Sequence, residues 1–199
     1  MFSVKFLRKA AVASIAAAAV TVPALASVAS AAPADKGPDR DRNNPGASQA
    51  SDFAVKRFMA NRRNEGVCVQ ALIDGQRGWS RVECGDEVEV GTTGQSRAIE
   101  ALRIMPIRLG GLTVQGHVQD RGWERTERAR DGQWVTVGDF RGDKRLEAVR
   151  IDSRSDIALQ GHVQDIGWQR WSTNRGRGPA VAGTEGQSKR LEALRINAG

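Results

Sequence analysis

The amino-acid sequence predicts an all-β protein in which three tandem repeats of about 45 residues form one pseudo-threefold unit. First, a Gly-Trp pair occurs three times, and its tryptophans, Trp79, Trp123 and Trp168, are 44 and 45 residues apart. Second, a phrase ending in Glu-Ala, an aliphatic residue, Arg and Ile follows each pair. Third, apolar and polar residues alternate ahead of the second and third tryptophans, which is the period of a half-buried strand.

Three copies of this length suit a β-trefoil-like fold with four short strands in each repeat, and a β-prism is the alternative. One copy of a supersecondary unit cannot bury its apolar face alone, so the copies must pack on one another. A linear solenoid is less well suited, since three copies close into a compact unit. The repeats are expected at about 66–107, 111–153 and 156–197, within a domain over 65–197.

Residues 1–32 have the plan of a secretory signal peptide. Three basic residues near the start precede an uncharged run rich in Ala and Val, and small residues lie where a signal peptidase would cleave. A transmembrane anchor needs about 20 strongly apolar residues. This run is only weakly apolar and is interrupted by Pro23. We therefore expect a secreted protein with no membrane span after cleavage.

Residues 33–64 are expected to form a linker that contains a possible short helix. The stretch up to Ala50 is rich in Pro, Gly, Asn and charge and has almost nothing to bury. From Ser51 to Arg63 the apolar residues recur at helical spacing, with Ser51 or Asp52 as the cap. The residues expected to share one face of this helix are Phe53, Val55, Phe58 and Met59.

Within each repeat we expect an alternating strand, a tight turn into the Trp strand, a variable loop, a Gly-rich turn and a closing strand. The alternating strands are 112–119 and 157–164. In the latter, apolar or small residues share one face, and Gln160, His162 and Gln164 share the other. The polar face could serve as a ledge for a ligand or be an ordinary solvated face.

The closing strand carries one glutamate in each repeat, Glu100, Glu147 and Glu192. By strand parity each faces the same way as the apolar residues that follow it, for example Leu194. A buried, unpaired carboxylate is very costly. We therefore expect each Glu to accept hydrogen bonds from a Gly-rich turn or to pair with an arginine; the alternative is an exposed position at the start of the strand.

The two cysteines, Cys68 and Cys84, both lie in the first repeat. In an exported protein such a pair indicates a disulfide. Two free thiols or a metal pair are the alternatives, but two cysteines at this spacing with no histidine nearby make a poor metal site. We expect the disulfide and no metal.

Composition and motifs point away from catalysis. Without the three basic residues of the predicted signal, 27 basic and 23 acidic residues remain, a net charge of +4. This mild excess suits an anionic surface such as a bacterial cell wall, and export argues against a nucleic-acid partner. No GxSxG, HExxH, Walker or dinucleotide motif occurs in the sequence. We expect no enzyme activity and no cofactor.

Binding is expected to involve the tryptophans and the polar ledge. An indole offers a large flat apolar area with one N–H donor. The three repeated tryptophans could instead fill the core, which is the more common place for large aromatics. In that case binding would fall to the loops and to Trp134 and Trp171, which lack repeat equivalents. The candidate binding residues are Trp79, Trp123, Trp134, Trp168, Trp171, His117, His162, Gln119 and Gln164.

The phrases GHVQDIGWQRW and AGTEGQSKRLEALRI in the third repeat closely resemble the clostridial hydrophobic W repeat, or ChW repeat. The second repeat keeps His117, Gln119, Trp123 and LEAVRI but has GDFRG in place of the GTxG turn. The first has Leu72 where the others have histidine. The resemblance covers about two-thirds of the chain and implies a secreted or surface-attached protein of a Gram-positive bacterium.

The resemblance also implies a non-catalytic module that binds polysaccharide or protein, without naming the ligand. We therefore expect a secreted binding or adhesion module for cell-wall or environmental polysaccharide or for a surface protein. The alternative is a secreted hydrolase inhibitor that presents the variable loop 173–181, with Arg175 and Arg177 directed at an acidic or trypsin-like pocket.

Overall fold

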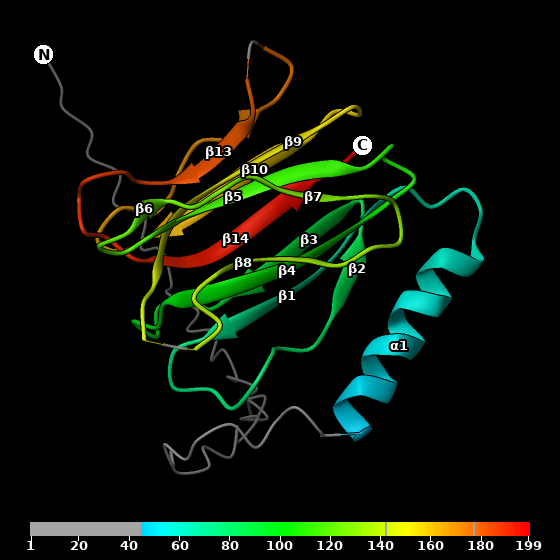
Figure 1. The fold of residues 1–199 in the computed structure, drawn as a ribbon, viewed down its shortest axis with the longest axis horizontal. Coiled ribbons are helices and arrows are strands. Elements are labelled where there is room, and N and C mark those ends of the chain that lie inside the picture. The colour runs from blue at the N-terminus through cyan, green and yellow to red at the C-terminus, as the bar shows by residue number, and fades with distance from the viewer. Residues whose placement is uncertain (1–44, 142, 177) are drawn as a thin grey trace, which may run out of the picture. The chain divides into compact units, whose positions relative to one another are not determined.

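The structure, a computed structural model, describes residues 45–141, 143–176 and 178–199. This part of the chain contains one helix, α1 (Pro45–Ala60), followed by fourteen strands, so the all-β prediction is confirmed (Figure 1). The predicted signal peptide and the first part of the linker lie outside the described residues. In chain order the strands are β1 (Gly66–Ile73), β2 (Glu83–Gly85), β3 (Glu87–Gly91), β4 (Ile99–Ile107), β5 (Leu112–Val118), β6 (Gly122–Trp123), β7 (Glu127–Ala129), β8 (Val135–Gly138), β9 (Leu146–Ser153), β10 (Ala158–Val163), β11 (Gly167–Trp168), β12 (Ser172–Thr173), β13 (Ala180–Gly183) and β14 (Leu191–Asn197).

The strands form three antiparallel sheets. Sheet A has the order β2-β1-β4-β8. Sheet B has the order β11-β10-β14-β3, with β12 also paired to β10. Sheet C has the order β13-β9-β5-β6, with β7 also paired to β5. Each sheet is therefore centred on the first and closing strands of one repeat and includes one strand from another.

The borrowed strands close a cycle. Strand β3 of the first repeat pairs with β14 of the third, β8 of the second pairs with β4 of the first, and β13 of the third pairs with β9 of the second. In Figure 1 the red strand β14 accordingly lies in the same sheet as the green strand β3, although β3 comes much earlier in the chain. This exchange agrees with the expected pseudo-threefold order, and the choice between a trefoil-like and a prism arrangement stays a prediction.

One apolar core serves all three sheets. The repeat-equivalent residues Ile99, Leu146 and Leu191 are all fully buried and belong to the same cluster. Along β10 the burial alternates as predicted, with Leu159 and Val163 inside. We call the side of each sheet that faces this cluster its inner face and the opposite side its outer face.

A β-bulge interrupts every pair of first and closing strands. The register shifts between Leu72 and Ile73, and at the equivalent positions of the other two repeats. In the third repeat Val163 pairs with Leu191 while His162 pairs with Ala193, so Glu192 is the extra residue. Strand parity therefore fails here: Leu191 enters the core, and the Glu192 carboxylate lies against His162 on the other side.

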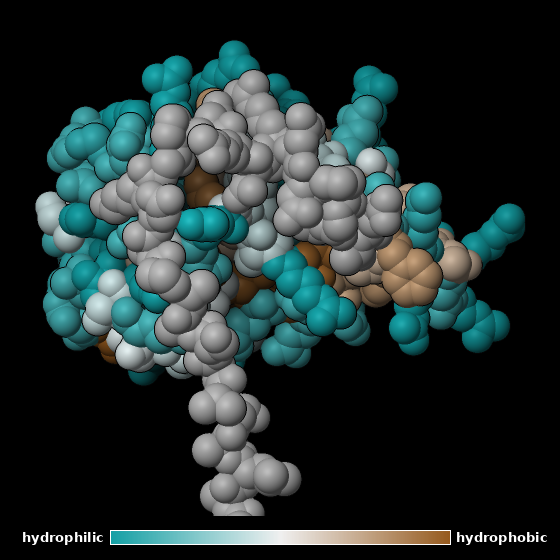
Figure 2. All heavy atoms as spheres, turned by 90° about the horizontal axis from the view of Figure 1, so that it is seen from below, coloured by the Kyte–Doolittle hydropathy of each residue, from teal (hydrophilic) through white to brown (hydrophobic). Residues whose placement is uncertain are grey.

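Helix α1 begins earlier and packs differently than the sequence predicts. It starts at Pro45, a residue suited to the first helical turn, so the cap at Ser51 or Asp52 is wrong, and residues 45–50, which were expected in the linker, are helical. Val55 and Phe58 pack on the protein, but Phe53 is 68% exposed. Figure 2 shows tan apolar side chains on the right of the view, where α1 lies, among teal polar ones.

A small apolar cluster lies on the outer face of sheet A. Cys68, Met105 and Ile107 belong to it, and residues of α1 cover it. The predicted disulfide joins Cys68 to Cys84, which are direct partners on β1 and β2. In the chain-entropy model closing a loop of this length stabilises the fold by about 3 kcal/mol. The guanidinium of Arg108 then holds the end of the helix segment by donating to the backbone oxygens of Met59, Asn61 and Asn64.

Candidate functional site

The outer face of each sheet carries the same stacked pair of side chains. The guanidinium of an arginine from the closing strand lies over the indole of that repeat's tryptophan. The distances from the guanidinium carbon to the ring centroid are 4.2 Å for Arg103 on Trp79, 4.3 Å for Arg150 on Trp123 and 4.0 Å for Arg195 on Trp168. Such contacts contribute about 0.5–1 kcal/mol at exposed sites.

The three repeated tryptophans are therefore not core residues. They are half-buried, and none belongs to the apolar clusters of the described residues. The reason is register: Trp123 pairs with His117 and Trp168 with His162, and these histidines alternate with the core residues of their strands. The core interpretation of these tryptophans is wrong, because paired residues in a sheet share a face.

A glutamine fixes each Trp hairpin to the first strand of its repeat. Gln70 donates to the backbone oxygen of Ser80, Gln115 to that of Glu124 and Gln160 to that of Gln169, at 2.9, 2.7 and 2.8 Å. The later glutamines, Gln119 and Gln164, are half-buried and sit beyond the strand ends. Their backbone N–H groups donate to the backbone oxygens of Arg145 and Arg190. Of the predicted polar ledge, Gln115 and Gln160 therefore hold the hairpins.

In the second and third repeats the buried glutamate meets a histidine and an arginine. The Glu192 carboxylate lies 2.8 Å from Nη2 of Arg190 and 3.0 Å from Nδ1 of His162, although the latter contact lacks hydrogen-bond geometry. The Glu147 contacts are longer, 3.7 Å to Arg145 and 3.4 Å to His117. From sequence, each glutamate was expected to meet either a Gly-rich turn or an arginine. In these two repeats the structure shows the arginine.

Each histidine also touches the tryptophan of its repeat. The ring centroids of His117 and Trp123, and of His162 and Trp168, are 5.3 Å apart with the rings nearly perpendicular. A chain of contacts therefore runs from tryptophan to histidine to buried glutamate in two repeats. The first repeat has Leu72 at the histidine position, and its Glu100 is half-buried.

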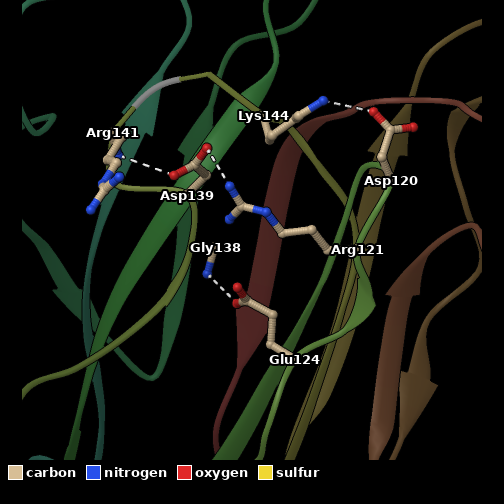
Figure 3. Close-up of polar contacts among 7 residues, drawn as sticks. All are labelled: Asp120, Arg121, Glu124, Gly138, Asp139, Arg141 and Lys144. Carbon is tan, nitrogen blue, oxygen red and sulfur yellow. Dashed lines mark hydrogen bonds and ion pairs between the residues drawn. The ribbon is translucent and has the colours of Figure 1, made fainter.

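The junction between the first and second repeats uses different polar groups (Figure 3). Asp139 replaces the threonine of the other turns, and its buried carboxylate accepts from the Arg141 N–H at 3.3 Å and from Arg121 at 3.5 Å. The Gly138 N–H donates to the Glu124 carboxylate at 3.0 Å. This turn is held by charges where the GTxG turns carry a hydroxyl.

Two further tryptophans lie at the surface. Trp171 is 43% exposed and Trp134 is 40% exposed. Trp171 directly precedes Ser172, the partner of Leu159 in sheet B. Trp134 directly precedes β8 of sheet A. Phe140 and Ile166 are also exposed, and no repeat pattern marked them.

The rest of the polar surface of the described residues is only shallowly hollowed. An open groove of about 280 Å³ crosses the outer face of sheet C, lined by Thr113, Val114, Gln115, Thr126, Arg150, Asp152 and Pro179. In the loop proposed for inhibition, the Arg175 guanidinium pairs with Asp156 at 2.7 Å; Arg177 lies outside the described residues.

The sequence reasoning passed over the stacked arginines, although their place in the repeated Glu-Ala-aliphatic-Arg-Ile phrase, between core residues, marks them as outward-facing.

Comparison with known proteins names one family. The model of the family ChW, Clostridial hydrophobic W, matches residues 162–198. This match supports a ChW repeat protein and suggests a non-enzymatic repeat module. The ChW segment runs from His162 through Trp168 to the end of β14. That the first two repeats are also ChW repeats stays a prediction.

No curated protein and no solved structure matches the chain significantly. In the part of the chain that the structure describes, no helix is long and apolar enough to cross a membrane.

Proposed function

We propose that the protein is a secreted, non-catalytic module that binds a cell-wall or environmental polysaccharide. The observation that carries the proposal is the exposure of Trp171 next to sheet B, where it is among the most exposed large apolar side chains of the β-strand part. The ChW match includes β11 and β14 of the same sheet.

The surroundings of Trp171 suit a sugar. On β10, Gln160 follows Leu159, the partner of Ser172. Its amide oxygen accepts from Nη1 of Arg195 at 3.3 Å, and Nε of Arg195 donates to the Glu89 carboxylate at 2.8 Å. An amide, a guanidinium and a carboxylate thus form a row beside a flat apolar ring. A sugar ring can stack on the indole while its hydroxyls exchange hydrogen bonds with this row.

Secretion is proposed from the sequence of residues 1–32 and from the family match. Small exported domains rely on disulfides, and the Cys68–Cys84 bond supports an oxidising compartment. The producer is proposed to be a Gram-positive bacterium, to whose wall the protein stays attached through the polymer it binds.

The inhibitor hypothesis receives less support. Its loop would have to present a free cationic side chain, but Arg175 is held by two contacts to Asp156, 2.8 Å from Nε and 2.7 Å from Nη2. We keep protease inhibition as the assay to run if no polymer is bound.

A sedimentation assay tests the proposal. The chain from residue 32 onward is mixed with insoluble peptidoglycan, chitin, cellulose and starch, at low and high salt. We expect retention on at least one polymer at high salt, lost in Trp171→Ala and kept in Trp134→Ala, which removes an equally exposed indole from sheet A. Retention lost at high salt would reflect charge attraction alone, and no retention on any polymer would redirect the search to a protein partner.

A further inference from the structure

Arg103, Arg150 and Arg195 occupy the same place in the three repeats, and Arg150 differs from Arg195 in its partners. All three stack on a tryptophan. Arg195 also pairs through Nε with the carboxylate of Glu89, whereas Nε of Arg150 donates to the uncharged amide of Gln115 at 2.5 Å. Among the described residues, no carboxylate forms an ion pair with Arg150.

The borrowed strand explains this difference. Strand β3 places Glu89 opposite Arg195, β8 places Thr136 opposite Arg103, and β13 places Val181 opposite Arg150. Burial lowers the pKa of Arg103, so that guanidinium is partly withdrawn from water. Arg150 thus combines a fixed, stacked guanidinium with a position where the neighbouring strand supplies no counter-charge.

An open groove lies over this guanidinium. Its polar lining consists of Arg150, Gln115, Thr113, Thr126 and Asp152. One oxygen of Asp152, Oδ1, accepts from the Ser153 N–H at 2.9 Å and from Asn174 at 3.2 Å. The other oxygen makes no hydrogen bond within the described part of the chain. The groove therefore offers a bidentate donor at one point and hydroxyl and carboxylate acceptors at others.

We propose that this groove binds a sugar residue that carries a carboxylate, such as a uronic acid or a muramic acid. The planar guanidinium matches a carboxylate with two parallel hydrogen bonds, and its terminal nitrogens make no hydrogen bond to the described residues. The hydroxyls of the same sugar donate to Asp152 and exchange hydrogen bonds with the two threonines.

Asp152 argues against a free inorganic anion as the ligand. The negative charge of Asp152 repels phosphate or sulfate. A sugar instead brings hydroxyl groups that donate hydrogen bonds to the Asp152 carboxylate. The inference rests on the proposed function only in taking the ligand to be a saccharide, and it concerns sheet C, whereas Trp171 belongs to sheet B.

Titration with soluble sugars, followed by amide and indole NMR signals, tests the site. The probes are trigalacturonate, its methyl ester, N-acetylmuramic acid, N-acetylglucosamine and inorganic phosphate. We expect trigalacturonate or N-acetylmuramic acid to shift the Trp123 indole signal, and the matching uncharged sugar to bind about tenfold more weakly. The two acidic probes separate a plant-type uronic acid from a wall muramic acid as the source.

Variants locate the carboxylate contact. Val181→Glu copies onto β13 the carboxylate that Glu89 supplies on β3, and it should weaken binding of the acidic sugar about tenfold, as should Arg150→Gln. Arg103→Gln is the matched control, because Arg103 stacks on Trp79 in the same way, and it should leave the affinity unchanged. Retained amide dispersion in the spectrum of each variant shows that it has folded.

Three results would overturn the inference: equal binding of the acid and its ester, equal loss in the Arg150 and Arg103 variants, or tighter binding of phosphate than of either acid. None of these depends on the polymer assay with Trp171, so the proposed function can stand when this site fails. Conversely, if the acidic sugar binds the unmodified protein but not Val181→Glu, the site is supported, even when Trp171→Ala still sediments with the polymer.

Discussion

Glu192 is only 6% exposed, and its carboxylate is held on two sides by groups of its own repeat. Arg190 contacts one oxygen at 2.8 Å and His162 lies 3.0 Å from the other. Its backbone oxygen accepts from the Thr92 N–H of the first repeat at 2.8 Å. One residue thus combines a buried ion pair with a contact between repeats, which gives its charge a structural role.

Glu192→Gln should lower the free energy of unfolding by about 1–3 kcal/mol, because the Arg190 guanidinium keeps its burial but loses its counter-charge. Urea denaturation followed by tryptophan fluorescence measures this. Glu89→Gln is the control, since Glu89 pairs with Arg195 at an exposed position and should cost less than about 0.5 kcal/mol. A loss below that value for Glu192→Gln would contradict the structural role.

Lys144 controls the ionisation of Asp120. Its ammonium lies 2.7 Å from the carboxylate and holds the pKa of Asp120 below the ordinary 3.8, chiefly through the hydrogen bond. Because the folded-state pKa is depressed, any stabilisation is present above pH 3.8 and is lost as the pH falls through the folded value. Lys144→Ala should raise the pKa in an NMR titration of the carboxyl carbon, and an unchanged pKa would contradict the pairing.

At the scale of the elements, a glycine ends each borrowed strand. Gly91, Gly138 and Gly183 have φ values of +101°, +93° and +102°. A Cβ on Gly183 would lie 2.2 Å from the backbone oxygen of Glu147. This close approach lets the next N–H donate to that same oxygen at 2.8 Å, as happens at all three junctions.

Gly183→Ala should therefore destabilise the fold by about 2–4 kcal/mol, since both the backbone angle and the contact exclude a side chain. Thermal unfolding followed by circular dichroism measures the change. Gly176→Ala is the matched control: no atom lies within 4 Å of its Cβ position, and its effect should stay within about 0.5 kcal/mol. Equal melting temperatures for the two variants would contradict the junction geometry.

Over the whole β-strand part, the cyclic exchange makes the repeats depend on one another. Each repeat takes a strand from the next and gives one to the preceding repeat, and the third closes back on the first. No repeat can complete its sheet alone, and the single apolar core spans all three. Stability is therefore shared across the unit instead of summed along a linear array.

Deletion of residues 156–199 tests this closure. It removes β13 from sheet C and β14 from its pairing with β3, so the remaining two repeats should lack a cooperative unfolding transition and show poor amide dispersion. The full chain from residue 45 is the control. A folded two-repeat fragment would indicate an open array in which the third repeat is dispensable.

Sequence patterns alone predict the repeats, the all-β class, the alternating strands and the Cys68–Cys84 disulfide. Each of these features has a local sequence signal, since period-two alternation, a repeated phrase and paired cysteines are visible within a few dozen residues. The outward arginines, such as Arg150, were recoverable by the same parity but were missed. The place of Trp123 and Trp168 outside the core followed from register and not from residue type.

Only the tertiary structure decided which strands are exchanged, where Glu192 points and what faces each arginine. The bulge that turns Glu192 away from the core is a property of two paired strands, not of either alone. The difference between Arg150 and Arg195 arises because strands of other repeats, β13 and β3, bring Val181 and Glu89 against them. Contacts between residues so distant in the chain have no local signal, because they exist only once the cycle has closed.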